Sequence, residues 1–570
     1  MIDELISSIK EQIELHDPNV KLSHHNKTLV QHINECKMIS EQLLKFYGLI
    51  HYHELIDVLC EIHDVGKLSP LWSIDNKKKS HIYVGLEILQ LPAVSRILLK
   101  KLNRTLNFLN IKEDAMFEII YFLVKIHHST IRPEKASKLS HFKDFVRFSN
   151  AQRLLQLIDA YGIFKLADII SASYETSEIR RVIGKYTQQY EFHEIKNRLC
   201  QTIKKKCLKK GLSFNDEKFR EQEQYAKLPG LHVLIAPTGW GKTAYSILKA
   251  TYEKPTKIFY ILPTITAIKS FYEDLKKIYY DNVGEYFYYA DVELILQREK
   301  QEIDPDKYVR LLDNFRFFIP KVNITTIDQL LLTLLNFRKY HLRRFCFRRS
   351  FFIFDEFHLL TPEMIQFLKA IIEIYAKEYK FKFLFMSATP SLSYINYLKE
   401  VIERNLNDKV VIPIENYKKL FKIMKRHKID LRFNKKILDD SIIDEIVKNY
   451  KQGLRVLIIV NEVERAIETY LKIKEKIKNG KSNDLTLIHS RFAVKDRSAQ
   501  ERLIPKSRIL VATQVAEVSL DISFDQLYTE IAPVPSLIQR FGRVNRYSKK
   551  RANENFNVVI LREEKPCLLY

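Results

Sequence analysis

The feature that most constrains this chain is a change in hydrophobic pattern near residue 210. Before it, apolar residues recur at helical spacing, as Leu55, Leu59 and Ile62 do, and glycine is sparse. After it come short, continuous apolar runs that are each followed by small or polar residues and separated by helical patterns. These runs are HVLI, KIFYIL, VNIT, FFIF, KFLFM, RVLIIV, LTLI and RILV. Strands that are apolar throughout and alternate with helices are typical of parallel sheets with helices on both faces.

The chain is too long for a single hydrophobic core, because 570 residues exceed the usual size of one domain. The apolar runs are also too many for one small sheet, and a variable stretch at 391–450 divides them. We therefore predict a multidomain fold with an all-α domain over residues 1–205. Two tandem α/β domains with parallel sheets follow, over residues 206–395 and 396–570.

The formal net charge of +24 favours a polyanionic partner, although a Lys-rich surface from a biased genome is an alternative. The six cysteines form no CxxC pair, which argues against a zinc ribbon or a disulfide framework and for a reducing compartment. The N-terminus lacks the apolar core of a signal peptide, and no stretch reaches the ~20 apolar residues that span a bilayer. We expect a cytoplasmic protein without a membrane partner.

The segment Ala236–Thr243, APTGWGKT, follows the run HVLI and opens a helical pattern, which is the context of a phosphate-binding loop. Gly239 and Gly241 allow backbone N–H groups to wrap phosphates. Lys242 can reach the β- and γ-phosphate oxygens, and Thr243 offers a hydroxyl to Mg²⁺. The segment predicts a binding site for ATP with Mg²⁺.

Two later segments complete this nucleotide site. Asp355 and Glu356 follow the run FFIF, so Asp355 can hold the Mg²⁺ and Glu356 can position or deprotonate the attacking water. In Gln539–Arg546, QRFGRVNR, Arg543 and Arg546 share one helical face and can reach the γ-phosphate from a neighbouring domain. A basic, solvated helix is the alternative for this last segment, and the interleaved Gln and Gly argue against it.

The helical region carries an ordered set of histidines and aspartates in apolar surroundings. Its members are His32, His63, Asp64, His81, His127, His128 and Asp168. A buried Asp is costly unless it is paired or binds a metal, and imidazole with carboxylate suits Mn, Fe, Co, Ni or Zn. An adjacent His-Asp pair can serve two ions, which can act on both the attacking and the leaving oxygen of a phosphodiester. Any single member could be a core histidine with a satisfied hydrogen bond, but the whole ordered set favours a metal centre.

From the phosphate-binding loop onward, the segments resemble a superfamily 2 DExD/H-box helicase over residues 215–550. The segments are APTGWGKT, LPT, TTIDQ, DEFH, SAT, HSRF, ATQVAEVSLDI and QRFGRVNR. The resemblance implies tandem RecA-like domains, and it implies that Gln222 contacts adenine, with Gln224 as a close competitor. It also implies nucleic-acid contacts by Pro263, Thr264, Thr325, Thr326, Thr513 and Gln514.

The order HD, H, HH and D resembles the HD phosphohydrolases. An HD domain ahead of a superfamily 2 helicase resembles the signature helicase–nuclease of type I CRISPR–Cas systems. In this chain Phe357 stands where that family's DEVH box usually has Val. Family members often carry a further domain after the arginine segment, so we expect either a truncated chain or a separate subunit that supplies it.

The resemblance implies two enzymatic activities. The first is an ATP-dependent translocase and helicase that moves 3′ to 5′ on single-stranded DNA, with Glu356, Arg543 and Arg546 as catalytic residues. The second is a nuclease that cuts single-stranded DNA at the HD site, with Asp64 as a catalytic residue and one or two divalent ions (Mn, Co, Ni, Fe or Mg). An RNA-guided surveillance complex is the implied partner, and degradation of foreign DNA in antiviral defence is the implied role.

Three alternatives stay open at this point. The chain could be a DNA-repair or RNA helicase with a structural helical domain, a nucleotide hydrolase with an accessory ATPase, or a scaffold that keeps motor relics. Metal binding at the HD set separates the first of these from the nuclease. The basic run Arg338–Arg349 is either part of the DNA path or a solvated loop.

Overall fold

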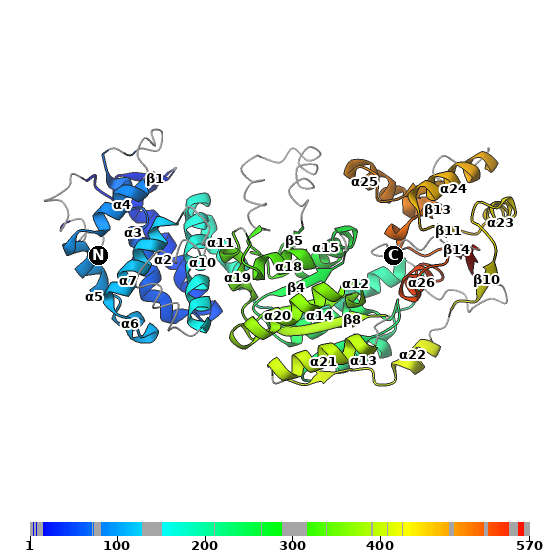
Figure 1. The fold of residues 1–570 in the computed structure, drawn as a ribbon, viewed down its shortest axis with the longest axis horizontal. Coiled ribbons are helices and arrows are strands. Elements are labelled where there is room, and N and C mark those ends of the chain that lie inside the picture. The colour runs from blue at the N-terminus through cyan, green and yellow to red at the C-terminus, as the bar shows by residue number, and fades with distance from the viewer. Residues whose placement is uncertain are drawn as a thin grey trace.

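The computed structural model describes the greater part of the chain. The described residues are 4, 7, 15–24, 26–70, 72, 81–127, 151–209, 211–263, 265–287, 316–337, 339–388, 392–406, 408–423, 426–477, 484–517, 522–546 and 557–563. They form a helical region followed by two α/β regions, which lie in a row from the N-terminal to the C-terminal part of the chain (Figure 1).

The helical region is built on α2, which runs from Leu29 to Tyr47 and packs along α10. Its helices are α2 (Leu29–Tyr47), α3 (His53–Ile62), α4 (His81–Leu89), α5 (Pro92–Lys100), α6 (Asn103–Leu109), α7 (Glu113–Lys125), α10 (Ala151–Ser173) and α11 (Thr176–Thr187), with short 3-10 helices at Ile50–Tyr52 and Val65–Leu68. A capping box of Thr28 and Gln31 begins α2, and Gly48 ends it with a φ of 73°. The region is helical as predicted, apart from a two-stranded hairpin of β1 (Leu22–His24) and β2 (Lys27–Thr28).

The first α/β region contains a seven-stranded sheet in which every strand pairing is parallel. Its order is β5-β6-β4-β7-β8-β3-β9. The strands are β3 (Leu231–Ile235), β4 (Ile258–Leu262), β5 (Val283–Tyr286), β6 (Val322–Thr326), β7 (Phe351–Asp355), β8 (Lys382–Ser387) and β9 (Val410–Val411). The helices are α12 (Phe192–Lys209), α13 (Asp216–Ala226), α14 (Lys242–Tyr252), α15 (Ile265–Tyr279), α18 (Ile327–Leu334), α19 (His341–Arg344), α20 (Pro362–Tyr379) and α21 (Leu392–Leu406).

The second α/β region contains a six-stranded parallel sheet in the order β10-β15-β14-β11-β13-β12. The strands are β10 (Ile429–Phe433), β11 (Val456–Ile459), β12 (Leu485–Ile488), β13 (Ile509–Ala512), β14 (Gln526–Glu530) and β15 (Val558–Arg562). The helices are α23 (Asp440–Lys451), α24 (Val463–Lys476), α25 (Val494–Leu503) and α26 (Val534–Phe541). Helix α22 (Tyr417–Ile423) precedes this sheet in sequence and packs against the cores of the first region. Two parallel α/β regions after a helical region confirm the predicted fold class.

The predicted boundary between the α/β domains, at residues 395 and 396, lies inside α21. Strand β9 follows α21 and pairs with β3, so residues 410–411 belong to the first sheet. We therefore propose that the second α/β domain begins between β9 and β10, and the domain boundaries remain a prediction.

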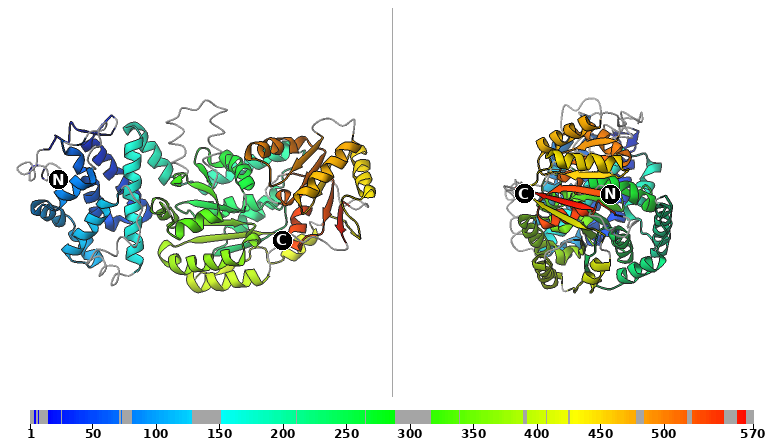
Figure 2. Two further views of the ribbon diagram at one scale, coloured as in Figure 1. Left: turned by 45° about the horizontal axis from the view of Figure 1, so that its top comes forward. Right: turned by 90° about the vertical axis from the view of Figure 1, so that its right-hand side faces the viewer.

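Alternation along the strands of the first sheet separates two cores. Phe352 and Phe354 of β7 face a core that continues into the helical region, whereas Phe351 and Ile353 face a second core on the opposite side. Two further cores cover the faces of the second sheet and contain only residues from Ile437 onward. Figure 2 shows from a second direction that the long helix α10 lies where the helical region meets the first α/β region.

Among the described helices, none is by itself both long and apolar enough to cross a bilayer. Only α4 and α5 taken together meet those criteria, and the pair is bent by 80°.

Candidate metal centre and nucleotide-binding site

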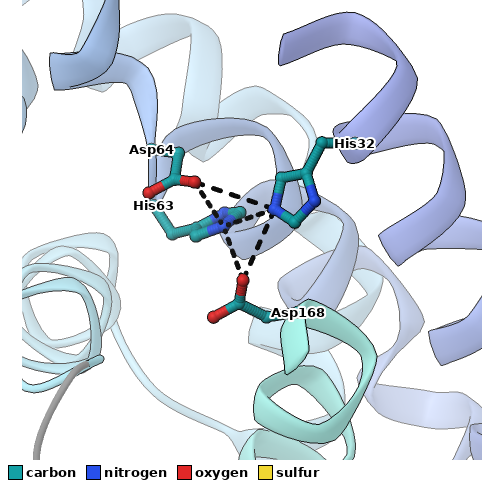
Figure 3. A group of neighbouring side chains, drawn as sticks. All are labelled: His32, His63, Asp64 and Asp168. Atoms are coloured by element: carbon teal, nitrogen blue, oxygen red, sulfur yellow. Dashed lines mark hydrogen bonds and ion pairs between the residues drawn. The ribbon is translucent and has the colours of Figure 1, made fainter. Parts of the chain in front are cut away.

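Four side chains of the predicted HD set converge in the interior of the helical region (Figure 3). His32 comes from the middle of α2, His63 and Asp64 follow the last turn of α3, and Asp168 lies on α10. The Nε2 atoms of His32 and His63 are 3.3 Å apart. Asp168 Oδ1 lies 3.4 Å from His32 Nε2 and 3.5 Å from His63 Nε2. All four residues are buried.

Asp64 also belongs to a second group of ligand atoms. Its Oδ2 atom lies 3.4 Å from His63 Nε2, whereas its Oδ1 atom lies 3.3 Å from His81 Nε2 and 3.9 Å from His127 Nε2. His81 and His127 bring their Nε2 atoms within 3.3 Å of each other. The two carboxylate oxygens of one aspartate therefore face two clusters of imidazoles. His128 lies outside the described residues.

The hydrogen bonds of the Nδ1 atoms orient these rings. His63 Nδ1 lies 3.1 Å from the Cys60 carbonyl, and His127 Nδ1 lies 2.7 Å from the Val124 carbonyl. A carbonyl only accepts hydrogen bonds, so both Nδ1 atoms carry a proton, and Nε2 is the ring nitrogen that each histidine turns to the centre. Imidazole Nε2 atoms together with carboxylates are the donor set that divalent transition metals prefer. The residues therefore fit one or two such ions.

Opposite charges surround the two carboxylates. Lys67 Nζ lies 2.5 Å from Asp64 Oδ2, and Lys165 Nζ lies 2.5 Å from Asp168 Oδ2. Burial alone would raise the pKa of both carboxyls, but these lysines and His63 outweigh burial and hold both pKa values well below their usual range. Burial alone would lower the pKa of His63, but Asp64 and Asp168 outweigh it and raise that pKa to about 9. Both carboxylates are therefore ionised and able to bind cations.

His24 lies against this centre and was not predicted. Its ring centroid is 4.3 Å from that of His32, and its Nε2 atom is 3.3 Å from Lys67 Nζ. Burial and the neighbouring Lys67 lower the pKa of His24 to about 3, so the ring is neutral. No motif marks this histidine, because the β1–β2 hairpin brings it to the centre from outside the helices.

The predicted phosphate-binding loop lies between β3 and α14. Gly239 and Gly241 adopt φ values of 82° and 101°, which favour glycine, and Lys242 opens α14. Gln222 is buried and donates from Nε2 to the Trp240 carbonyl at 2.8 Å. A Cβ atom on Gly241 would come within 2.7 Å of Gln222 Nε2 and would displace that side chain, while the positive φ of Gly241 favours glycine on its own. Gln224, the competitor of Gln222, is exposed.

Asp355 ends β7, and Glu356 follows it in the left-handed region with a φ of 51°. Lys242 Nζ donates to Glu356 Oε1 at 3.0 Å, while Glu356 Oε2 is buried and accepts no hydrogen bond from the described residues. Burial and the adjacent Glu356 raise the pKa of Asp355 to about 6. Burial alone would raise the pKa of Glu356, but Lys242, His358 and Arg543 lower it. An ionised carboxylate with a free oxygen beside a P-loop lysine can accept a hydrogen bond from water.

The two predicted arginines lie at the contact between the α/β regions. They do not share a helical face as predicted, because α26 ends at Phe541 and residues 542–546 continue as a non-helical turn. Arg543 is close enough to Glu356 to lower its pKa, and its guanidinium donates to the Ala516 and Glu517 carbonyls at 3.1 and 2.5 Å. Arg546 brings its backbone carbonyl to Gly239, where an added Cβ atom would lie 3.3 Å from that oxygen.

Arg426, which no motif identified, bridges the same contact. Its guanidinium donates to the carbonyl of Arg546 and to the carbonyl and hydroxyl of Thr238. It lies between the two sheets in sequence, where the composition is variable, so sequence patterns gave no signal for it.

A hydrogen-bonded chain also crosses this contact. His358 Nδ1 lies 2.7 Å from Ser387 Oγ, and its Nε2 atom lies 2.8 Å from Gln539 Nε2. The chain joins the segments DEFH, SAT and QRFGRVNR. It therefore connects the ends of β7 and β8 to helix α26 of the second region.

The predicted nucleic-acid residues divide into several groups. Pro263 and Thr326 are half-buried at the ends of β4 and β6, and Thr264 lies outside the described residues. Thr325 is 1% exposed and its hydroxyl donates to the Tyr286 carbonyl at 2.7 Å, which argues against a DNA contact by its side chain. Strand alternation turns Thr325 inward and Thr326 outward.

The last two predicted nucleic-acid residues lie at the end of β13. Thr513 is 2% exposed, and Gln514 donates to the Asn461 carbonyl at 3.0 Å. Their predicted contacts with nucleic acid stay a prediction.

The basic run Arg338–Arg349 is neither a solvated loop nor a free DNA path. Arg344 is 0% exposed and Arg348 6% exposed, and both donate to Asp159 of α10 at 3.0 and 3.1 Å. Arg349 alone among the described arginines of the run is exposed. Arg344 and Arg348 therefore help to hold the helical region to the first α/β region.

Comparison with known proteins agrees with both α/β regions. A model of the DEAD/DEAH box helicase family matches residues 222–397, which include the phosphate-binding loop and DEFH. A model described as CRISPR-associated nuclease/helicase Cas3, C-terminal, matches residues 452–549, which include QRFGRVNR.

Curated relatives carry the same description. A CRISPR-associated Cas3 protein of Methanocaldococcus jannaschii is 32% identical over 354 residues, which is 58% of this chain and 46% of that protein. The CRISPR-associated nuclease/helicase Cas3 of Methanothermobacter thermautotrophicus is 30% identical over 342 residues, 56% of this chain and 38% of that protein. The matched part thus spans less than half the length of these relatives.

The solved structure of T. fusca Cas3 with AMPPNP shows that the fold extends through the helical region. It superposes with a TM-score of 0.61 at 17% identity and covers 97% of this chain and 76% of its own. The helical region, the two α/β regions, the order of the nucleotide-binding segments and the matches to relatives agree with the family that the sequence resembles. Over both α/β regions, the chain is similar to the Cas3 family of CRISPR-associated nuclease/helicases.

Proposed function

We propose that this chain is an ATP-driven translocase and helicase that moves 3′ to 5′ on single-stranded DNA and is coupled to a metal-dependent single-stranded DNA nuclease. It acts with an RNA-guided surveillance complex to degrade foreign DNA. The observation that carries the nuclease half is Asp64, whose two oxygens face two separate groups of histidines, all buried except the half-buried His81.

The chain's own residues define the nuclease site. His32, His63 and Asp168 would hold one ion, His81 and His127 a second, and Asp64 would touch both. When bound, divalent ions supply the Lewis acidity that phosphodiester hydrolysis needs.

The charge of the centre also favours an anionic substrate. Lys67 and Lys165 each place an ammonium group beside one carboxylate. The two ammonium groups thus balance the negative charges of the two carboxylates before any metal ion binds. Bound metal ions would therefore make the centre net positive, and a net positive centre would attract a phosphodiester.

The motor half uses the contact between the α/β regions. The loop around Gly241 and Lys242 would bind the phosphates of ATP, and Asp355 would hold Mg²⁺. Glu356 would orient the attacking water through its free Oε2 atom, and Arg543 would approach the γ-phosphate from the second region. ATP would draw the two regions together and hydrolysis would release them, which advances the strand.

The test of the nuclease half is cleavage of circular single-stranded DNA without ATP, in Mg²⁺, Mn²⁺, Co²⁺ or Ni²⁺. Wild-type protein should cut, and Asp64→Ala should not. Asp57→Ala is the matched control, because Asp57 lies on α3, just before Asp64 in sequence, with its side chain 34% exposed, and its loss should leave cleavage intact. No cleavage with any metal, by protein that still hydrolyses ATP on DNA, would favour a repair or RNA helicase with a structural helical domain.

The test of the motor half is Lys242→Ala. This change removes the only P-loop cation that can reach the phosphates, so DNA-stimulated ATP hydrolysis and duplex unwinding should both be lost while cleavage of circular DNA without ATP persists. Unwinding by the variant would rule the motor assignment out.

A further inference from the structure

A buried polar chain lies behind His32, on the side away from the metal centre. His32 Nδ1 lies 2.9 Å from Ser171 Oγ, and Ser171 Oγ donates to Glu35 Oε2 at 2.8 Å. Lys27 Nζ donates to the same carboxylate at 2.6 Å, and Thr176 Oγ1 donates to Glu35 Oε1 at 2.5 Å. None of Lys27, Glu35, Ser171 and Thr176 belongs to a motif of the sequence.

The polar groups of this chain satisfy one another completely. Lys27 is 5% exposed, and its other two protons go to the Ser171 and Tyr174 carbonyls at 2.7 and 2.6 Å. Glu35 is 7% exposed and Ser171 is 0% exposed. A buried network in which every donor has an acceptor is rigid, because any rearrangement leaves a polar group without a partner.

The direction of the hydrogen bonds fixes the state of His32. The Glu35 carboxylate is paired with an ammonium group and only accepts, so the single proton of the Ser171 hydroxyl points to Glu35. The alternative acceptor of that proton, the His32 carbonyl, is neutral and more distant at 3.3 Å. Ser171 Oγ must then accept from His32 Nδ1, which leaves the lone pair on Nε2, the atom that faces the centre.

His32 differs in this respect from the other oriented rings. The Nδ1 atoms of His63 and His127 contact backbone carbonyls, which no substitution removes. The Nδ1 atom of His32 contacts a side chain that leads to a carboxylate. A carboxylate behind a metal-binding histidine fixes its tautomer and raises the basicity of the ligand atom.

We propose that Glu35, acting through Ser171, is a positioning residue that sets the metal affinity of the centre by fixing the tautomer of His32. The inference rests on the proposed metal centre and assigns a role to residues outside it. The chain also explains why β2, α2, α10 and the start of α11 meet at this point, since each supplies one member.

The test is calorimetric titration of the full chain with Mn²⁺ in the absence of DNA and ATP. Glu35→Gln removes the charge and gives the side chain a donor that competes with the Ser171 proton. We expect it to raise the Kd for Mn²⁺ about 10- to 100-fold. Ser171→Ala removes the hydroxyl that contacts His32 itself, and it should raise the Kd for Mn²⁺ by a similar factor.

Glu61→Gln is the matched control. Glu61 is 5% exposed and pairs with Lys37 and Lys101, and none of its described contacts goes to a ligand of the centre. Thermal unfolding of each metal-free variant reports the loss of stability, which both Glu→Gln changes should share. Only Glu35→Gln should weaken Mn²⁺ binding.

Two double variants test whether Glu35 acts through His32. In a His32→Ala background, Glu35→Gln should leave the remaining Mn²⁺ affinity unchanged, and the effects of Glu35→Gln and Ser171→Ala should not add. Wild-type affinity in Glu35→Gln, or equal weakening in Glu61→Gln, would overturn this inference alone. Wild-type protein that binds no Mn²⁺ would overturn the metal centre and the inference together.

Discussion

The two joints of this molecule are built in opposite ways. At the first joint, between the helical region and the first α/β region, one hydrophobic core runs from Leu29 of α2 through the first sheet without a break. Asp159 of α10, which is 0% exposed, receives hydrogen bonds from Arg344, Arg348 and Tyr379 of the α/β region. At the second joint, the cores of the second sheet contain only its own residues among those described.

The contrast indicates which part of the molecule moves. Separating the first joint would expose apolar surface and leave buried ions unpaired, and both effects are costly. The described polar contacts of the second joint, such as those of Gln539 with His358 and Arg426 with Thr238, can be exchanged for water at little cost. We expect the metal centre to travel with the first α/β region as one unit while the nucleotide cycle opens and closes the second joint.

The largest expected effect is at the first joint. Asp159→Ala leaves Arg344 and Arg348 buried without their shared carboxylate, so the free energy of unfolding should fall by about 3–5 kcal/mol. Urea unfolding followed by circular dichroism measures it. Glu445→Ala, which removes a partly exposed partner of Arg432 in the second region, should cost about 1 kcal/mol or less. Equal effects of the two changes would mean that the buried Asp159 cluster stabilises the protein no more than a partly exposed ion pair does.

The next effect concerns the distance between α10 and α19. A Cβ atom on Gly162 would lie 2.0 Å from the His341 carbonyl, so Gly162→Ala must push the helices apart. We expect a loss of about 1–3 kcal/mol in the free energy of unfolding. Gly184→Ala on α11, where a Cβ atom meets nothing within 4 Å, should instead stabilise by about 0.5–1 kcal/mol. Stabilisation by both substitutions would show that α10 and α19 are not tightly packed at Gly162.

A pH effect follows from a lysine at the first joint. Lys257 is 0% exposed, its Nζ atom lies 4.0 Å from the centroid of the Tyr186 ring of α11, and burial lowers its pKa to about 7. Between pH 7 and 10 the unfolded chain keeps the proton that the folded chain has lost. The free energy of unfolding should therefore rise with pH, by at most about 1.4 kcal/mol per pH unit from this group.

Lys257→Met isolates that contribution. The variant should show a smaller rise in the free energy of unfolding between pH 7 and 9.5 than the wild type does, because methionine carries no proton to lose. Identical pH dependence of the two proteins would mean that Lys257 keeps its proton in the folded state.

The smallest expected effect on stability is at the second joint. Gln539→Ala removes the contact with His358 across the joint, and the free energy of unfolding should change by less than about 0.5 kcal/mol. DNA-stimulated ATP hydrolysis should fall about 2- to 30-fold, because the contact couples the two regions. The exposed Gln452→Ala should change neither quantity. A large loss of stability in Gln539→Ala would mean that the second joint, like the first, is held by contacts that are costly to break.

Local patterns were sufficient where a function depends on a few consecutive residues. The glycines around Lys242, the Asp355–Glu356 pair and the His63–Asp64 pair were each predicted because a strand end, a tight turn or a helix end fixes what their side chains can face. The apolar runs predicted the strands for the same reason, since a strand buried on both faces needs apolar residues at every position.

Patterns failed where the partner lies far along the chain. The run that includes Arg344 and Arg348 has the composition of a solvated or DNA-binding segment, and its partner Asp159 is 185 residues away from Arg344. His24 and Arg426 gave no signal because a hairpin and an interdomain segment bring them to sites that their neighbours in sequence do not form. A pair of threonines does not show which of them faces inward, so the burial of the Thr325 side chain could not be predicted from the sequence.

By itself, the sequence determined the fold class, the order of the regions and the types of side chain that the two candidate sites contain. It did so because backbone periodicity and turn geometry act over a few residues. Only the tertiary structure decided that Asp64 faces two groups of histidines and that Arg344 and Arg348 of the basic run pair with Asp159 at the first joint. It also decided that Glu35 is hydrogen-bonded to His32 through Ser171. Those outcomes depend on the burial of charges by residues distant in sequence, and burial decides whether a charge is solvated, paired or held against a ligand.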